Sequence, residues 1–339
     1  MRHGGMAVIM IILSTLGCNG SSHVARPKEI PVLPIELSGE IAARIAELSG
    51  LGWYNDYLIL LPQYPSRFSE NGATGALFYI PKEEIREFLE GKRDVILPGK
   101  IEIHYEGVTD EISGFEGFES ICFSGNRVFM TIEASGIGMM GYLIKGEITE
   151  DLTRIDLDPA LITPIPPQSD IDNASDETML ILNDKIYTVY EGNGGNVNPH
   201  PVAHVFDLEL NPIEEIPFPG IEYRVTDATR PGEDGSFWVI NYFWPGDAAA
   251  YHSAPDLLVE QYGTGETHSR FQSVERLVKM KVTQSGITLS DTAPIPLKLI
   301  GDDDSRNWEG IAQFDTEGFL ICTDYYPGTI LGFVKFTAE

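Results

Sequence analysis

The chain has 339 residues, 42% of them hydrophobic, and a formal net charge of −28 at neutral pH. That length and apolar content allow a sizeable core, in either two ordinary domains or one large β domain. The excess of acid argues against nucleic acid as a partner, because phosphate backbones require a basic face, and it makes acidic lipid surfaces equally poor partners.

Residues 1–17 are typical of a lipoprotein signal peptide. Arg2 supplies a positive charge, and Met6 to Leu16 form an apolar run that is too short to span a bilayer as a helix. The run ends in Thr-Leu-Gly-Cys, which resembles the lipobox of bacterial lipoproteins and predicts acylation of Cys18. We therefore expect an exported protein of the cell envelope, anchored to a membrane through lipid on its periplasmic or outer-membrane face. The alternative is an ordinary signal peptide with an incidental cysteine.

Residues 18–29 are polar and rich in small residues, which predicts a flexible tether, and residues 30–339 are predicted to form a single domain. Within that domain one pattern recurs: a polar residue, a small residue, an apolar hairpin with a turn midway, and a second polar residue. The two polar residues are 14 positions apart in four copies and 15 apart in the last. The pairs are Ser49 and Gln63, Glu119 and Glu133, Glu177 and Glu191, Asp227 and Asn241, and Glu309 and Asp324. Turn residues such as Asn-Asp and Glu-Gly stand midway, where a hairpin needs them.

Further β-type segments follow each hairpin. Third strands are predicted at 77–80, 142–144, 203–208, 277–282 and 330–336, and fourth strands at 101–105, 160–165, 215–218 and 295–300. The last copy has no fourth strand, but residues 30–37 resemble 294–299 and could supply it. The repeat predicts an all-β fold, a five-bladed β-propeller with four-stranded blades whose N-terminal strand closes the last blade. A six-bladed ring is the alternative.

In a propeller the first strand of each blade lines the central channel. The hairpin spacing therefore predicts a ring of oxygen donors at one mouth, formed by Ser49, Glu119, Glu177, Asp227 and Glu309. Two unit charges about 4 Å apart repel by about 4 kcal/mol at an effective dielectric of 20, so several bare carboxylates require a cation or raised pKa values. Because every donor is oxygen, we expect calcium as the cofactor. The alternative is that the acids satisfy backbone amides around the channel.

The returning strands supply the candidate catalytic residues. Glu133, Glu191 and Asp324 could each act as general base towards a water molecule. Arg230, Arg306 and Trp308 are candidates for substrate binding, because a positive charge beside an acidic mouth could hold an anionic group. For the two arginines an internal salt bridge is the alternative.

Two short segments resemble known families. Glu47-Leu-Ser-Gly-Leu51 and Trp308-Glu-Gly-Ile311 resemble the first and last ring segments of the calcium-activated nucleotidases, or apyrases, and similar openings occur in esterase-like and phytase-like propellers. The resemblance implies a five-bladed propeller with a central calcium held by Ser and Glu side chains.

We therefore expect a calcium-dependent hydrolase of a phosphate or carboxylic ester, acting as a monomer on a small anionic or ester substrate. A non-catalytic ligand- or protein-binding propeller with a structural calcium remains the alternative, and a calcium-dependent lactonase is a third possibility.

Overall fold

The computed structural model describes residue 1 and residues 26–69, 74–136 and 138–336. The predicted signal peptide and Cys18 lie outside these ranges. No helix within them is long and apolar enough to cross a bilayer.

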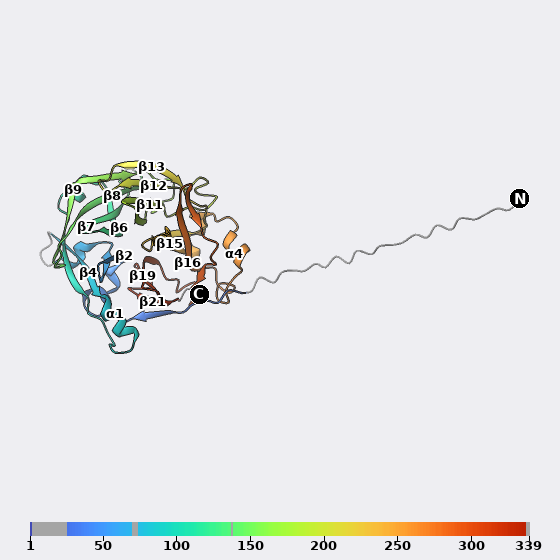
Figure 1. Ribbon diagram of the computed structural model, residues 1–339, viewed down its shortest axis with the longest axis horizontal. Helices are drawn as coiled ribbons and strands as arrows, with labels where there is room; N and C mark the ends of the chain where they lie inside the picture. The colour runs from blue at the N-terminus through green and yellow to red at the C-terminus, as the bar shows by residue number, and fades with distance from the viewer. Residues whose placement is uncertain (2–25, 70–73, 137, 337–339) are drawn as a thin grey trace.

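The described chain is almost entirely β structure, arranged as sheets around a central axis in the manner of a propeller (Figure 1). The largest sheet has the strand order β2-β3-β4-β5-β9-β8-β7-β6. Its strands are β2 (Leu48–Tyr54), β3 (Tyr57–Pro62), β4 (Gly75–Pro81), β5 (Gly99–His104), β6 (Phe115–Ser124), β7 (Arg127–Ala134), β8 (Met140–Ile148) and β9 (Arg154–Ile165). This sheet consists of two antiparallel four-stranded halves, because its only parallel pairing, between β5 and β9, joins them at their outer strands.

Three smaller sheets complete the ring. One contains β10 (Thr178–Leu182), β11 (Lys185–Val189), β12 (Val202–Asp207) and β13 (Pro212–Pro217) in that order. The next contains β14 (Arg224–Ala228), β15 (Ser236–Phe243), β16 (Val274–Thr283) and β17 (Gly286–Leu289), with β18 (Ile295–Pro296) also paired to β16. The last contains β19 (Trp308–Phe314), β20 (Gly318–Thr323), β21 (Leu331–Lys335) and β1 (Val32–Ile35).

The N-terminal strand completes the last sheet, as the sequence predicted. β1 pairs antiparallel with β21 in a register that aligns Val32 with Val334 and Ile35 with Leu331. The strands that open the hairpins, β2, β6, β10, β14 and β19, contact one another in a closed cycle around the axis. The small residues of the repeat allow this approach: a Cβ atom on Gly310 would lie 2.6 Å from Cys322 Sγ and 2.9 Å from Leu51 Cγ.

Several elements were not predicted. Helix α1 (Lys82–Leu89) follows β4, buries Ile85 and places Arg86 beside Asp315 and Glu317 of the last hairpin. The long segment after β15 holds α3 (Ala248–Tyr251) and α4 (Leu257–Tyr262), where Asp256 caps the N-terminus of α4. Strand β17 was missed, and the fourth strand expected at 295–300 is reduced to the two residues of β18.

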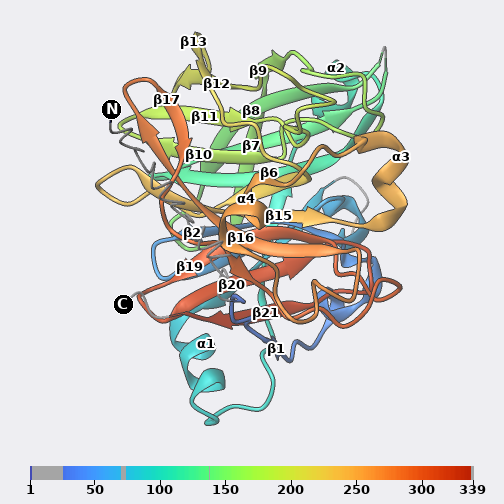
Figure 2. The ribbon, with the colours of Figure 1, turned by 90° about the vertical axis from the view of Figure 1, so that its right-hand side faces the viewer.

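Seen from the side, the ring has two distinct faces (Figure 2). Helix α3 projects from one face, and the turn between β16 and β17 projects from the other. α1 and β1 lie at the periphery, far from the axis (Figures 1 and 2).

Candidate functional site

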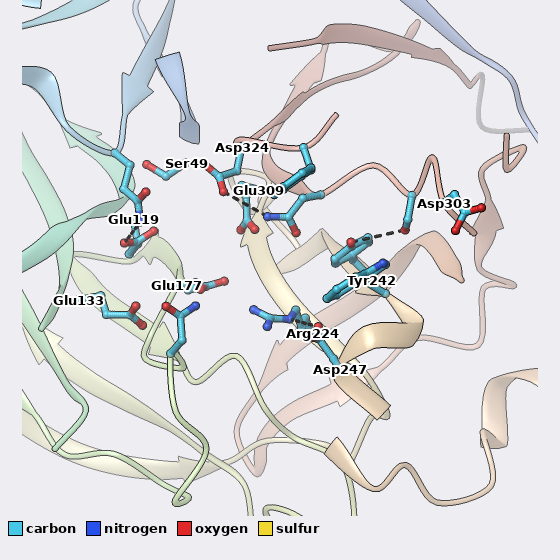
Figure 3. A pocket seen from close by; sticks show the side chains of 16 residues that line it. Ser49, Glu119, Glu133, Glu177, Arg224, Tyr242, Asp247, Asp303, Glu309 and Asp324 are labelled. Carbon is cyan, nitrogen blue, oxygen red and sulfur yellow. Dashed lines mark hydrogen bonds and ion pairs between the residues drawn. The ribbon is translucent and has the colours of Figure 1, made fainter. Parts of the chain in front are cut away.

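A pocket of about 410 Å³ opens at the mouth of the ring that carries α3 (Figure 3). Its lining comes from the starts of inner strands, the ends of the strands that return to them, and the loops beyond. The residues are Ser49, Gln63, Glu119, Glu133, Asn173, Glu177, Arg224, Tyr242, Trp244, Asp247, Asp303, Ser305, Asn307, Glu309, Asp324 and Tyr326.

The hairpin spacing brings most of the predicted residues together. Ser49, Glu119, Glu177 and Glu309 line the pocket, and so do Gln63, Glu133 and Asp324 from the returning strands. The ladder skips a residue at Ser49, Glu119 and Glu309, which are bulged between the pairs on either side. A bulge turns its side chain away from the regular alternation of the strand. This local irregularity aims the three side chains into the shared cavity (Figure 3).

Hydrogen bonds satisfy these groups only in part. Gln63 Nε2 donates to Glu119 Oε1 at 3.0 Å, and Asn307 Nδ2 donates to Asp324 Oδ2 at 3.4 Å. Three carboxylate oxygens of the pocket have no hydrogen-bond partner within the described chain, Glu133 Oε2, Glu177 Oε2 and Asp324 Oδ1, and the same is true of Oε2 of the buried Glu191. Such oxygens are costly to bury unless a proton or a cation binds them.

Burial and mutual repulsion raise the pKa values of the acids in the pocket and so favour their protonated forms. Burial, followed by the charge of Glu191, raises the pKa of Glu133 to about 7, and burial raises the pKa of Asp324 to about 6. The pKa values of Glu119, Glu177 and Glu309 are also raised well above the ordinary range, first by burial and then by neighbouring carboxylates. An ionised cluster at neutral pH therefore requires a positive partner.

Arg224, at the start of β14, is the one cationic side chain that lines the described pocket. Its Nη1 pairs with Glu191, its Nε donates to Asp247 Oδ2 at 3.0 Å, and the ring of Tyr251 lies 5.3 Å from its Cζ. These contacts fix the plane of the guanidinium, while Nη2 donates no hydrogen bond to the described residues. The side chain is 15% exposed and points towards the acids in Figure 3, so Nη2 is placed to bind an anionic group.

Asp227 takes a different position from the one predicted. It is buried, its Oδ2 accepts a hydrogen bond from the amide of Ile311 at 2.8 Å, and it does not line the pocket. β14 is bulged between Val225 and Ala228, so the strand register shifts at this point. Asp227 thus ties inner strands to one another, the alternative role that the sequence left open for these acids.

Thr226 is the residue of β14 that corresponds to Ser49. Ser49 Oγ donates to Phe118 O at 2.6 Å, the carbonyl just before Glu119. In the same way Thr226 Oγ1 donates to Trp308 O at 2.7 Å, the carbonyl just before Glu309. The fixed spacing to Asn241 therefore placed this copy one residue too late, because the register of β14 shifts between Val225 and Ala228.

The three predicted substrate-binding residues all lie elsewhere. Arg306 and Trp308 are buried, and both donate to Glu275 Oε2, at 2.6 and 2.8 Å. For Arg306 the alternative of an internal salt bridge is therefore the observed arrangement. Arg230 lines a second pocket at the hairpin turns, on the opposite mouth of the ring. Of the catalytic candidates, Glu133 and Asp324 line the acidic pocket, whereas Glu191 lies behind it against Arg224.

The chemical type of the residues in the pocket suits a hard cation, but their side chains lie too far apart to coordinate one. The carboxylates that line the pocket offer only oxygen ligands, and three of their buried oxygen atoms are unpartnered. In the described part of the chain, however, no three His, Cys, Asp or Glu side chains are grouped closely enough to hold a metal ion. Binding would therefore require the carboxylates to move closer together than they lie here.

Two aromatic side chains mark the rim of the pocket. Trp244 is 48% exposed and Tyr326 is 59% exposed, although both line the cavity. Tyr326 is supported by Tyr325, with ring centroids 4.8 Å apart, and by the guanidinium of Arg44 at 5.1 Å. Half-exposed aromatic faces beside a polar cavity suit stacking on a ligand.

No protein-family model matches the chain, and no curated protein matches it. Solved structures of similar shape include an exo-β-1,3-galactanase from Phanerochaete chrysosporium, with a TM-score of 0.49, 8% identity and coverage of 91% of this chain and 64% of that one. A GH43_1 enzyme from Xanthomonas citri gives a TM-score of 0.47 at 10% identity and covers 90% of this chain and 91% of that one. The soluble aldose sugar dehydrogenase of Escherichia coli gives 0.43 at 10% identity, with coverage of 90% and 99%. At these scores the likeness carries no argument about activity.

Proposed function

We propose that the protein is an exported, lipid-anchored, five-bladed β-propeller that binds calcium at the acidic pocket and hydrolyses a small anionic ester there. The blade count treats the two halves of the largest sheet as separate blades. The closed cycle of five inner strands and the parallel join at the outer strands support it. The observation that carries the site is the convergence of Glu119, Glu133, Glu177, Glu309 and Asp324 on one cavity with several oxygens unpartnered.

The ion would be held by Glu119, Glu177 and Glu309, with Ser49 beside them. When bound, calcium would offset the charge of the acids and polarise a phosphoryl or carbonyl oxygen. The roles of orienting the substrate and moving a proton would fall to the chain's own residues. Arg224 would orient the anionic group through Nη2, and Glu133, which lines the pocket with an unpartnered Oε2, would accept a proton from water.

A non-catalytic ligand-binding propeller is the second candidate. The exposed faces of Trp244 and Tyr326 favour it, since stacking on a ring holds a ligand whether or not a bond is broken. In this case the calcium would be structural.

Thermal melting and turnover assays, each with calcium and then with a chelator, separate the candidates. The hydrolase predicts a calcium-dependent rise in melting temperature together with calcium-dependent cleavage of a substrate from a panel of ATP, GDP, phytate and nitrophenyl esters. A calcium-dependent rise without turnover would favour the binding propeller. Absence of any calcium effect on melting would contradict both.

A further inference from the structure

A basic cluster lies on the outer wall of the ring, where the described N-terminal segment joins the sheets. Arg26, Lys28, Arg270 and Lys298 line a surface crevice together with Glu29 and Glu266. We call these four cations the outer-wall basic cluster. They outnumber the two acids of the crevice in a chain whose net charge is −28, so this face differs in sign from the molecule as a whole.

Both acids of the crevice are already engaged. The side chain of Glu29 is 6% exposed and accepts hydrogen bonds from Thr267 N at 2.8 Å and from His268 N at 3.0 Å. Glu266 pairs with Arg270. The side chains of Arg26, Lys28 and Lys298 are exposed and form no ion pair with residues in the described ranges. Three cations therefore remain free to bind an anion from outside.

The cluster is built into the junction of two sheets. Ile30 forms a parallel bridge with Leu297, its amide donates to Pro296 O at 2.9 Å, and the amide of Lys298 donates to Ile30 O at 2.8 Å. β1, which follows directly, is the outermost strand of its sheet. The cluster therefore has a fixed position at the periphery, and it shares no residue with the acidic pocket.

The distance along the chain from Cys18 argues for a membrane as the partner. Arg26 follows Cys18 by eight residues. Eight residues span at most about 29 Å when fully extended, so an acylated Cys18 would let the cluster reach the bilayer surface and would keep it within about that distance. Charges act over a Debye length of about 8–10 Å at physiological salt, so acids that lie farther than this from the crevice contribute little at the contact.

We propose that the outer-wall basic cluster docks the propeller on a membrane surface of anionic lipid. The ring then rests on its outer wall, and the acidic pocket stays open to solvent. The net charge of the chain predicted that acidic lipid surfaces would be poor partners, because it averages over a surface far larger than the contact. The proposal rests on the proposed acylation of Cys18 but not on hydrolysis, so failure of the hydrolase assays leaves it intact.

Vesicle co-sedimentation of the full-length chain tests the proposal. Vesicles of pure phosphatidylcholine are compared with vesicles of phosphatidylcholine and phosphatidylglycerol in equal parts. Any acyl anchor contributes equally to binding of both. Since each cation near an anionic leaflet strengthens binding about fivefold, we expect at least a tenfold preference for the anionic vesicles at low salt. The preference should vanish at about 0.5 M sodium chloride, where the Debye length is about 4–5 Å.

The double variant Lys28→Glu with Lys298→Glu should abolish the preference. The matched control, Lys92→Glu with Lys185→Glu, makes the same change in net charge outside the crevice, at side chains that are 66% and 39% exposed, and should keep the preference. Equal melting temperatures would show that both variants fold. Equal binding to both vesicle types, or equal loss in the control, would overturn the proposal. So would displacement by inorganic phosphate at constant ionic strength, which would make the crevice a phosphate site.

Discussion

Arg224 is the side chain on which the electrostatics of the pocket depend most. It neutralises Glu191, which is fully buried, and Asp247, which is 19% exposed. Without it, both carboxylates lose their positive partner in a region already crowded with acids. The guanidinium is therefore both a support for the wall of the pocket and the donor that faces its interior.

A double-mutant cycle measures the first of these roles. Replacing Arg224 by Gln should cost about 3–5 kcal/mol of unfolding free energy, because it strands a buried charge on Glu191. Adding Glu191→Gln should recover a large part of that loss, since the stranded charge is removed. Urea unfolding of the four chains gives the coupling. If the double variant is less stable than the Arg224→Gln chain, Glu191 is not the group that Arg224 neutralises.

Glu177 offers a test of the ring itself. Its carboxylate is buried, its Oε2 is unpartnered, and burial raises its pKa well above the ordinary range. Glu177→Gln should stabilise the metal-free chain at neutral pH and reduce the rise in melting temperature that calcium produces. Glu214→Gln, at a half-exposed site on β13, is the control and should change neither. A calcium effect of unchanged size would remove Glu177 from the site.

The sequence located the ring residues that depend on local register alone. A hairpin of fixed length returns its second polar residue to the start of the first strand, and so Glu119 with Glu133 and Glu309 with Asp324 were found correctly on one pocket. The bulge in β14 leaves no signal in the sequence, and because of it the predicted ring position fell on Asp227 instead of Thr226. Arg306 and Trp308 were misassigned because their partner, Glu275, lies on another sheet more than 30 residues away. Arg224 was missed for a similar reason, since only the fold brings it to Glu191.

At the scale of elements, the five inner strands must pass close to the axis, and glycine permits this where β19 meets β2. Gly310→Ala should destabilise the chain by about 1–3 kcal/mol, because the added Cβ would meet Cys322 Sγ at 2.6 Å and the backbone of Gly50 at 3.0 Å. Gly195→Ala is the control, since its Cβ would meet nothing closer than 3.8 Å. Chemical denaturation measures both. Equal stability of the two variants would show that the inner strands are less tightly packed than described.

The order of the sheets around the ring was predictable from the hairpins, whereas the contacts and the helix at the outer edges of the sheets were not. The repeat of apolar strands and turns fixes which segments pair, and the closing role of β1 follows from its likeness to 294–299. The parallel contact of β5 with β9 and the helix α1 depend on long-range partners such as Asp315 and Glu317. Neither leaves a periodic signal in the chain.

For the molecule as a whole, the raised pKa values predict an unusual dependence of stability on pH. In the metal-free chain, Glu133 has a pKa of about 7 against 4.5 in its ordinary range, and Asp324 has about 6 against 3.8. The folded state therefore binds more protons than the unfolded state between these values. The stabilising contribution is full below about pH 4 and is lost as the pH rises through 6 to 7.

We expect the melting temperature of the metal-free chain to fall between pH 5 and pH 8, and calcium to flatten that slope. At 1.36 kcal/mol per pKa unit, Glu133 alone contributes roughly 3 kcal/mol, so Glu133→Gln should reduce the slope visibly. Calorimetry with chelator across this range is the measurement. A melting temperature that rises with pH would show that the acids are already neutralised by the protein.

The account depends on one claim, that the converging acids bind a hard cation. Elemental analysis of the full-length chain, equilibrated with calcium and then dialysed against calcium-free buffer, tests it most directly. We predict about one calcium per chain, and well under one in the double variant Glu119→Gln with Glu309→Gln, because a hard divalent ion needs several charged oxygens. A folded chain that retains no divalent metal, or a double variant that retains as much as the parent, would contradict the claim.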